Sequence, residues 1–276
     1  MAIKKQVVET IGERAVYLLV EWSLLGAWRG VETSETSEDV SARKRIIRSE
    51  SSQKMVTLRN SVKALLNKYS HNAVFRPGVY TVPLEYIPTV EEKLKEALVT
   101  LEEIRQELRE EWPTILADAK ERLGKLFDAS DYHSADSAAR ELNMTYRYMS
   151  ISHTPDILKQ VAAETYQADL NRSKSQIEAE LEAFRSHLRS ALLQLVKNMR
   201  RTLTKPDGEK RRFGKTFFKN LNEFMETFDA RNLSEDGELS KVVSSLRKVA
   251  KGYDNSESLK SNPAMQDALN ADLSSI

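Results

Sequence analysis

The chain has 276 residues, 40% of them hydrophobic and 30% charged, and its 42 basic and 41 acidic side chains nearly cancel. This balance predicts no general attraction to nucleic acid or to an anionic membrane, so any such binding would need a local patch. Cysteine is absent, which excludes disulfides, thiolate nucleophiles and cysteine metal sites and is compatible with the cytoplasmic location that we expect.

The first predicted element is an apolar run from Ala15 to Trp28. It is too short to cross a bilayer and carries Glu21 in its middle, so we expect no membrane-spanning segment and no membrane partner. Its residues are apolar on every side, and periodicity therefore does not decide between a helix and a strand. The preceding residues contain Glu9 and Glu13 and lack a small-residue cleavage pattern, which is unlike a secretory signal.

A helix and a connector follow this run. Between Gln53 and Tyr69, apolar residues recur every three or four positions, which places them on one face of a helix. The stretch from Asn72 to Pro88 contains three prolines, which interrupt any regular pattern. Within it, the β-branched segment GVYTVP predicts one short strand at residues 78–83.

A long helical pattern begins at Thr89. Thr89 and Glu92 have the capping-box spacing, in which a threonine hydroxyl and a glutamate satisfy free N–H groups at a helix start. Apolar residues then keep the three-and-four spacing from Leu94 to Leu126. Pro113 lies inside this run and removes one backbone donor. Because the apolar phase continues past it, we expect a kink there and one continuous helix.

The longest predicted helix occupies the second half of the chain. Residues 127–153 predict a shorter helix with an aromatic exit, and Thr154-Pro155-Asp156 then predicts the start of a helix that ends near Thr204. An apolar stripe on that helix usually packs against helices of the same chain, and the alternative is a surface for another protein. Under the alternative, the candidate interface residues are Leu181, Phe184, Leu188, Leu192, Leu195 and Met199.

Two amphipathic helices are predicted after the longest one, at residues 213–228 and 238–250. Ser234, followed by two acidic residues, is a candidate cap for the second of them. Periodicity weakens after Gly252, so we expect a mobile tail at residues 253–276 with room for one short helix.

These elements predict a mainly α fold. We expect an elongated bundle of long helices or coiled-coil-like hairpins. Residues 1–252 are expected to form a single elongated helical domain, with a candidate subdivision near residue 150.

One segment approaches a nucleotide-binding signature, and it ends in Gly214-Lys215-Thr216. A phosphate loop needs four residues between its first glycine and the Gly-Lys-Thr, so that successive N–H groups surround the phosphates. Here Gly208 and Gly214 are separated by five residues. A charged helix end precedes the segment, whereas the loop requires a hydrophobic strand. We therefore interpret it as a helix-to-helix connection.

The same region is strongly basic. Between Lys197 and Lys219 there are nine basic residues and two acidic ones, with Phe213, Phe217 and Phe218 interleaved. Basic side chains beside aromatic rings that stack on bases are typical of single-stranded nucleic-acid binding. The alternative, which we favour, is that the phenylalanines pack inward and the basic residues interact with a helix dipole. The candidate nucleic-acid-binding residues are Arg200, Arg201, Lys205, Lys210, Arg211, Arg212 and Lys215.

The sequence contains no catalytic or metal-binding pattern. Its four histidines lie far apart and form no helical histidine pair. Glutamates such as Glu103 and Glu107 share a helix face, but the glutamate-histidine pairs of di-metal bundles are missing, so we interpret them as a solvated face. The nucleophile elbow and the dinucleotide glycine motif are missing too. We therefore predict that the protein is not an enzyme and needs no cofactor.

Three short motifs carry a resemblance to a known family: Trp22-Ser23, the Gly-x-Tyr-x-Val-Pro segment at residues 78–83, and the Asn-Leu-x-x-Asp turn at residues 232–236. In their order, they resemble an uncharacterised family of phage and plasmid helical proteins, often encoded near a MoxR-type AAA+ ATPase or a von Willebrand A-domain protein. The resemblance implies a phage or plasmid setting, an ATPase partner, and a small two-stranded β element that pairs residues 16–24 with residues 78–83.

We therefore hypothesise a non-enzymatic helical scaffold that acts through self-association, as a homo-oligomer, or through an AAA+ ATPase. The alternative is a nucleic-acid-binding protein that uses the basic region at residues 197–219.

Overall fold

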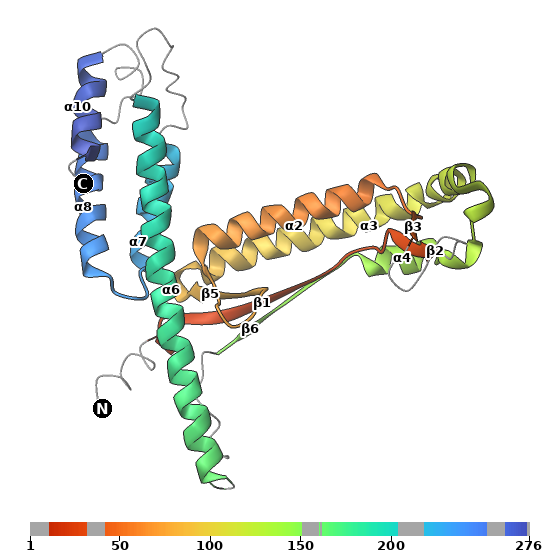
Figure 1. The fold of residues 1–276 in the computed structure, drawn as a ribbon, viewed down its shortest axis with the longest axis horizontal. Helices are drawn as coiled ribbons and strands as arrows, with labels where there is room; N and C mark the ends of the chain where they lie inside the picture. Colours follow the sequence, from red (N-terminus) through yellow and green to blue (C-terminus); the bar gives the residue numbers. More distant parts are fainter. Residues whose placement is uncertain are drawn as a thin grey trace. The chain divides into compact units, whose positions relative to one another are not determined.

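The computed structural model describes residues 11–31, 42–150, 160, 162–203, 218–252 and 263–274. This part of the chain is mainly α-helical (Figure 1), which confirms the predicted fold class. The chain divides into two compact units. Unit 1 comprises Met1–Tyr17, Lys68–Glu85 and Ser150–Ile276, and unit 2 comprises Leu18–Asn67 and Tyr86–Met149.

This division differs from the single domain expected over residues 1–252. The chain changes unit four times, and the last change, after Met149, lies at the subdivision expected near residue 150. Periodicity identifies the buried face of a helix, but it does not show which helices share a core. The interleaving of the two units was therefore not visible in the sequence.

A four-stranded sheet has the strand order β4-β5-β1-β6. Its strands are β1 (Ala15–Ser23), β4 (His71–Asn72), β5 (Val79–Pro83) and β6 (Asn143–Met149). The neighbouring positions of β1 and β5 confirm the pairing expected between residues 16–24 and 78–83. Strand β4 pairs antiparallel with β5, with His71 opposite Thr81, and all five residues of β5 are buried.

The strands β4 and β6 enlarge this sheet beyond the two strands that were expected. Strand β6 follows α4 (Ala135–Glu141), in the stretch where the sequence predicts a shorter helix with an aromatic exit. The exit is the strand itself, because the threonine and tyrosines of NMTYRYM favour extended backbone. A separate antiparallel ribbon pairs β2 (Trp28–Val31) with β3 (Ala42–Arg45).

The helices α2 (Glu50–Tyr69) and α3 (Ile87–Leu123) lie side by side and antiparallel (Figure 1). A salt bridge of 2.8 Å joins Lys54 Nζ on α2 to Glu107 Oε2 on α3. The helix α3 continues through Pro113, as the unbroken apolar phase predicts. Its buried residues keep the three-and-four spacing: Val90, Leu94, Ala97, Leu101, Ile104, Leu108, Trp112, Ile115 and Ala119.

The start of α3 corrects one local prediction. The capping box expected at Thr89 and Glu92 is wrong, because α3 begins at Ile87 without a side-chain cap and has Pro88 in its first turn. Proline is suited to this place, since its fixed φ is helical and the N–H that it lacks would have no partner in the helix.

The start of α2 is capped from the neighbouring helix. The Glu111 carboxylate on α3 accepts hydrogen bonds from the backbone N–H groups of Glu50 at 2.9 Å and Ser51 at 3.3 Å. It also accepts hydrogen bonds from the Ser49 and Ser51 hydroxyls, at 2.9 Å and 2.8 Å. One side chain therefore satisfies free donors at the α2 N-terminus and joins the two helices.

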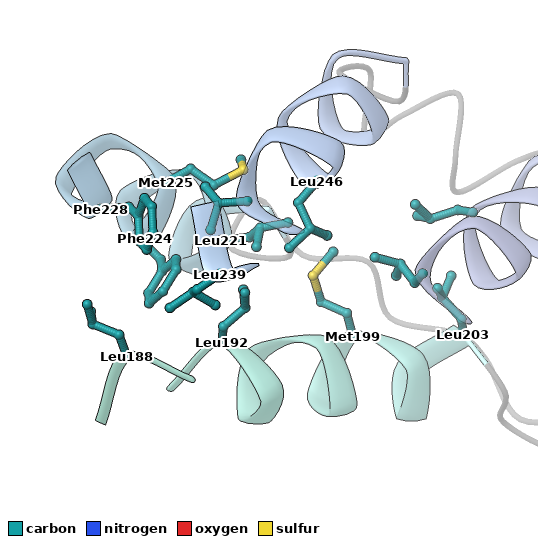
Figure 2. Packing of buried hydrophobic residues seen from close by; sticks show 13 residues of the cluster. Leu188, Leu192, Met199, Leu203, Leu221, Phe224, Met225, Phe228, Leu239 and Leu246 are labelled. Atoms are coloured by element: carbon teal, nitrogen blue, oxygen red, sulfur yellow. The ribbon is translucent and has the colours of Figure 1, made fainter. Parts of the chain in front are cut away.

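The described residues of the second half of the chain contribute four helices to unit 1: α6 (Ala163–Leu203), α7 (Lys219–Arg231), α8 (Gly237–Gly252) and α10 (Pro263–Ser274). They pack around one apolar cluster, most of which is seen in Figure 2. Within the described residues, no helix is both long and apolar enough to span a bilayer.

The helix α10 lies in the tail expected at residues 253–276, where the sequence left room for one short helix. Its Leu269 and Leu273 are buried in the cluster formed with α6, α7 and α8. The periodicity appeared weak because only a few apolar residues of this short helix are needed to hold it in place. The structure does not describe residues 253–262.

Removing the Glu111 carboxylate should destabilise the protein selectively. We expect Glu111→Ala to lower the free energy of unfolding by about 2 kcal/mol, because it leaves the N–H groups of Glu50 and Ser51 without their acceptor, while Ser49 Oγ still accepts the N–H of Ser52 at 3.1 Å. Urea denaturation measures this change. The control is Glu110→Ala, since Glu110 is exposed and its side chain accepts a hydrogen bond from Gln106. Equal effects of the two substitutions would contradict the capping role.

Candidate protein-binding groove

The apolar stripe of α6 packs within its own chain. Phe184, Leu188, Leu192 and Met199 are buried, whereas Leu181 and Leu195 are half-buried. Figure 2 shows Leu188, Leu192 and Met199 facing the side chains of α7 and α8. This arrangement agrees with the first interpretation of the stripe, in which its partners are helices of the same chain.

A groove remains beside this core, between α6 and α8. Its volume is about 390 Å³, and its lining is formed by Arg189, Leu192, Leu193, Val196, Glu238, Leu239 and Val242. Leu193 stands out because 54% of its surface is exposed, although it is adjacent to the buried Leu192. The groove is therefore an apolar surface that the described residues leave open to solvent.

Sequence reasoning missed this groove. On a helix, Leu193 lies about 100° around the axis from Leu192, at the edge of the buried stripe. The signal in the sequence was the doubling Leu192-Leu193, which widens the apolar face beyond what one neighbouring helix covers. Which side of the stripe would stay open depends on where α8 packs, and periodicity does not show that.

A salt bridge fixes one end of the groove. The Arg189 guanidinium donates two hydrogen bonds to the Asp236 carboxylate, from Nε at 2.6 Å and from Nη2 at 2.9 Å. This bidentate pair lowers the pKa of Asp236. Asp236 Oδ1 also accepts the backbone N–H of Leu239 at 3.2 Å, so it caps α8. The prediction of Ser234 as the cap is therefore wrong, because the capping residue is Asp236, two positions later.

The Asn-Leu-x-x-Asp turn has a structural role in positioning that cap. Asn232 Oδ1 accepts the backbone N–H of Asp236 at 2.9 Å, and Asn232 Nδ2 donates to Ser240 Oγ at 3.1 Å. Glu235 has a positive φ of 51°, which the turn requires between the two anchored residues. The turn thereby sets the direction in which α8 leaves α7 and forms its side of the groove.

The predicted nucleic-acid-binding residues are only partly described. Arg200 and Arg201 lie exposed in the last turn of α6. Lys205, Lys210, Arg211, Arg212 and Lys215 lie outside the described residues, as does the Gly-Lys-Thr segment. Lys248 and Lys251 are exposed near the end of α8.

A buried histidine lies where the sheet meets α6 and α7. The His71 Nε2 atom is 2.7 Å from the carbonyl oxygen of Arg231, the last residue of α7, and so carries the proton that is donated. The His71 ring stacks on Phe184 of α6 at 4.3 Å between centroids, and His187 lies edge-on at 6.2 Å. Burial, followed by the Arg231 charge, lowers the pKa of His71 to about 3. His71 is therefore a neutral cap of α7.

A second buried polar contact links β1 to α6. The Tyr17 hydroxyl donates to Glu180 Oε2 at 3.0 Å, and Glu180 has only 3% of its surface exposed. Burial raises the pKa of both side chains. Neither residue lines the groove, so this acidic pair has no access to a ligand bound there. The described residues contain no cluster of three or more His, Asp or Glu side chains suited to a metal ion.

Comparisons of the chain with protein-family models, with curated proteins and with solved structures find no match.

The low pKa of His71 predicts a loss of stability in acid. Between pH 6.5 and about 3 the unfolded histidine binds a proton that the folded one does not, so the free energy of unfolding should fall as the pH falls through this range. The largest slope is about 1.4 kcal/mol per pH unit. We expect His71→Gln to remove most of this slope in urea denaturation at pH 7, 5.5 and 4.5.

Comparing the pH dependence of the free energy of unfolding in the unchanged protein and in His71→Gln separates the contribution of His71 from those of its neighbours. His187 also has a lowered pKa and contributes in the same direction, whereas Glu180, with its raised pKa, contributes in the opposite direction. Both remain in the variant. An unchanged slope in His71→Gln would contradict the neutral, buried state of this ring.

Proposed function

We propose that this protein is a non-enzymatic helical scaffold that acts by binding other proteins, either further copies of itself or an AAA+ ATPase. The single observation that carries the proposal is the open apolar groove between α6 and α8, with Leu193 exposed at its edge. Apolar side chains that stay exposed beside a packed core are typical of protein-binding surfaces. The phage or plasmid setting and the cytoplasmic location stay predictions from the sequence.

The packing of the groove wall supports this function. Leu192 and Leu239 in its wall are buried in the core of unit 1. Arg189, at one end, is held by two hydrogen bonds to Asp236. A partner would meet side chains whose positions are already set, which reduces the entropy lost on binding.

A second candidate function is nucleic-acid binding at the C-terminal ends of α6 and α8. Lys197 and Arg201 are exposed on α6, and Lys248 and Lys251 are exposed on α8. Leu203 and Leu246 of the same two helices share the apolar cluster. Such a group of cations could contact a phosphate backbone without base specificity.

Leu193→Asp should abolish association of the protein. We expect size exclusion with light scattering to give the purified chain a mass above the 31.5 kDa monomer, or a stable complex with a co-expressed MoxR-type ATPase, and the substitution to remove that species. The reason is that a carboxylate at the groove edge would have to be desolvated without a partner.

Val99→Asp is the matched control, because Val99 is 63% exposed on α3, outside the groove. It should leave association unchanged. A protein that is monomeric at every concentration and does not bind the ATPase would overturn the proposed function. Equal loss of association in both variants would place the contact elsewhere.

Nucleic-acid binding is tested by replacing Lys197 and Arg201 with glutamate. If the second function holds, fluorescence anisotropy should show salt-sensitive binding of a single-stranded oligonucleotide, weakened by about tenfold or more in the double variant. Lys63→Glu with Lys120→Glu is the control, since both lysines are exposed on other helices. Absence of binding at low salt would exclude this function.

A further inference from the structure

We propose that the groove between α6 and α8 binds an amphipathic helix of a partner protein, because the same pair of helices already binds α10 of this chain. The inference rests on the proposed function and names the class of ligand: a helix of about two turns or more with large apolar residues at i and i+4.

The surface of α6 and α8 that α10 packs against, called the α10 seat below, shows which kind of helix this surface binds. The helix α10 contacts both α6 and α8. Its Leu269 and Leu273, spaced by four residues, are buried in one cluster with Leu203 of α6 and Leu246 of α8. Met265, four residues before Leu269, packs against the same cluster. An apolar stripe of i, i+4 and i+8 residues is therefore bound across the two helices.

The groove and the α10 seat are two stretches of one surface. On α6, Val196 lines the groove and packs against the cluster that contains Leu203, seven residues later, and Leu269 of α10. On α8, Val242 lines the groove, and both it and Val249, seven residues later, pack against this same cluster. Residues seven apart lie on nearly the same side of a helix, so the groove continues the α10 seat toward the helix N-termini.

The two stretches differ in what covers them. In the α10 seat, Leu203 is 2% exposed and Leu246 is fully buried. In the groove, Leu193 is 54% exposed, and none of the described residues covers it. The groove extends over α6 from residue 189 to residue 196, a rise of about 10 Å, which matches two turns of a bound helix.

The ends of the groove suit a helical ligand as well. Its centre is aliphatic, formed by leucines and valines of both helices, while Arg189 and Glu238 give it a polar rim. Arg189 is satisfied by Asp236, and Glu238 accepts a hydrogen bond from Lys241 at 2.9 Å. Because these charges already have partners, the energy of binding should come from apolar side chains placed on one face of the ligand.

The test uses a synthetic fluorescent peptide with the sequence of residues 263–274, capped at both ends, and the full-length protein. Binding is measured by anisotropy, and the bound region is located by hydrogen exchange. We expect protection at residues 189–196 and 238–242. The variant Leu193→Asp should bind at least about tenfold more weakly, since it replaces a buried apolar contact by a carboxylate that would lose its water. Val99→Asp should bind as the unchanged protein does.

Two altered peptides test the form of the ligand. Replacing the peptide leucine that corresponds to Leu269 by aspartate, or its alanine at Ala268 by proline, should abolish binding, because the first removes an apolar contact and the second breaks the helix. Equal binding of the proline peptide would overturn the helical ligand. Binding that Leu193→Asp does not weaken, protection confined to the α10 seat, or no binding at all would overturn the groove as its site.

These outcomes are separable from those of the proposed function. If the protein associates through Leu193 but does not bind the peptide, the proposed scaffold function stands and the proposal of a helical ligand is contradicted.

Discussion

Unit 1 depends on the burial of one side of α6. The stripe through Leu188, Leu192 and Met199 is shared by helices α7, α8 and α10, and each of them would expose its own apolar face without it. Phe184 of the same helix stacks on the ring of His71, which lies in the sheet. The groove is a consequence of this packing, since it lies where α8 covers the stripe but not its edge.

Much of the helical fold could be predicted from residue spacing. The three-and-four pattern located α2, α3 and α6, and it carried α3 correctly through Pro113. Predictions of helix caps were less reliable, because a residue distant in the sequence can accept the N–H groups that a neighbouring residue was expected to accept. Glu111, sixty positions away from Ser51, accepts two of the free N–H groups at the α2 N-terminus, and no local motif indicates this contact.

The candidate site was harder to predict than the fold for a related reason. Leu192 and Leu193 are identical in type and adjacent, yet one is buried and the other is exposed. The difference comes from the position of α8, which the Asn232–Asp236 turn fixes through hydrogen bonds within the turn. The burial of the short helix α10 has the same kind of cause, because Leu269 and Leu273 hold it in place once a complementary surface exists.

The interleaving of the units has a consequence for synthesis on the ribosome. Unit 2 is complete once Met149 has been made, but Tyr17 and His71 belong to unit 1, and their contacts with Glu180 and Phe184 form only after α6 has been made. At about 5–20 residues per second, the rest of the chain takes on the order of ten seconds. During that interval the residues of unit 1 that have been made lack the apolar cluster formed by α6, α7, α8 and α10. The nascent protein therefore has a defined period in which a chaperone can be needed.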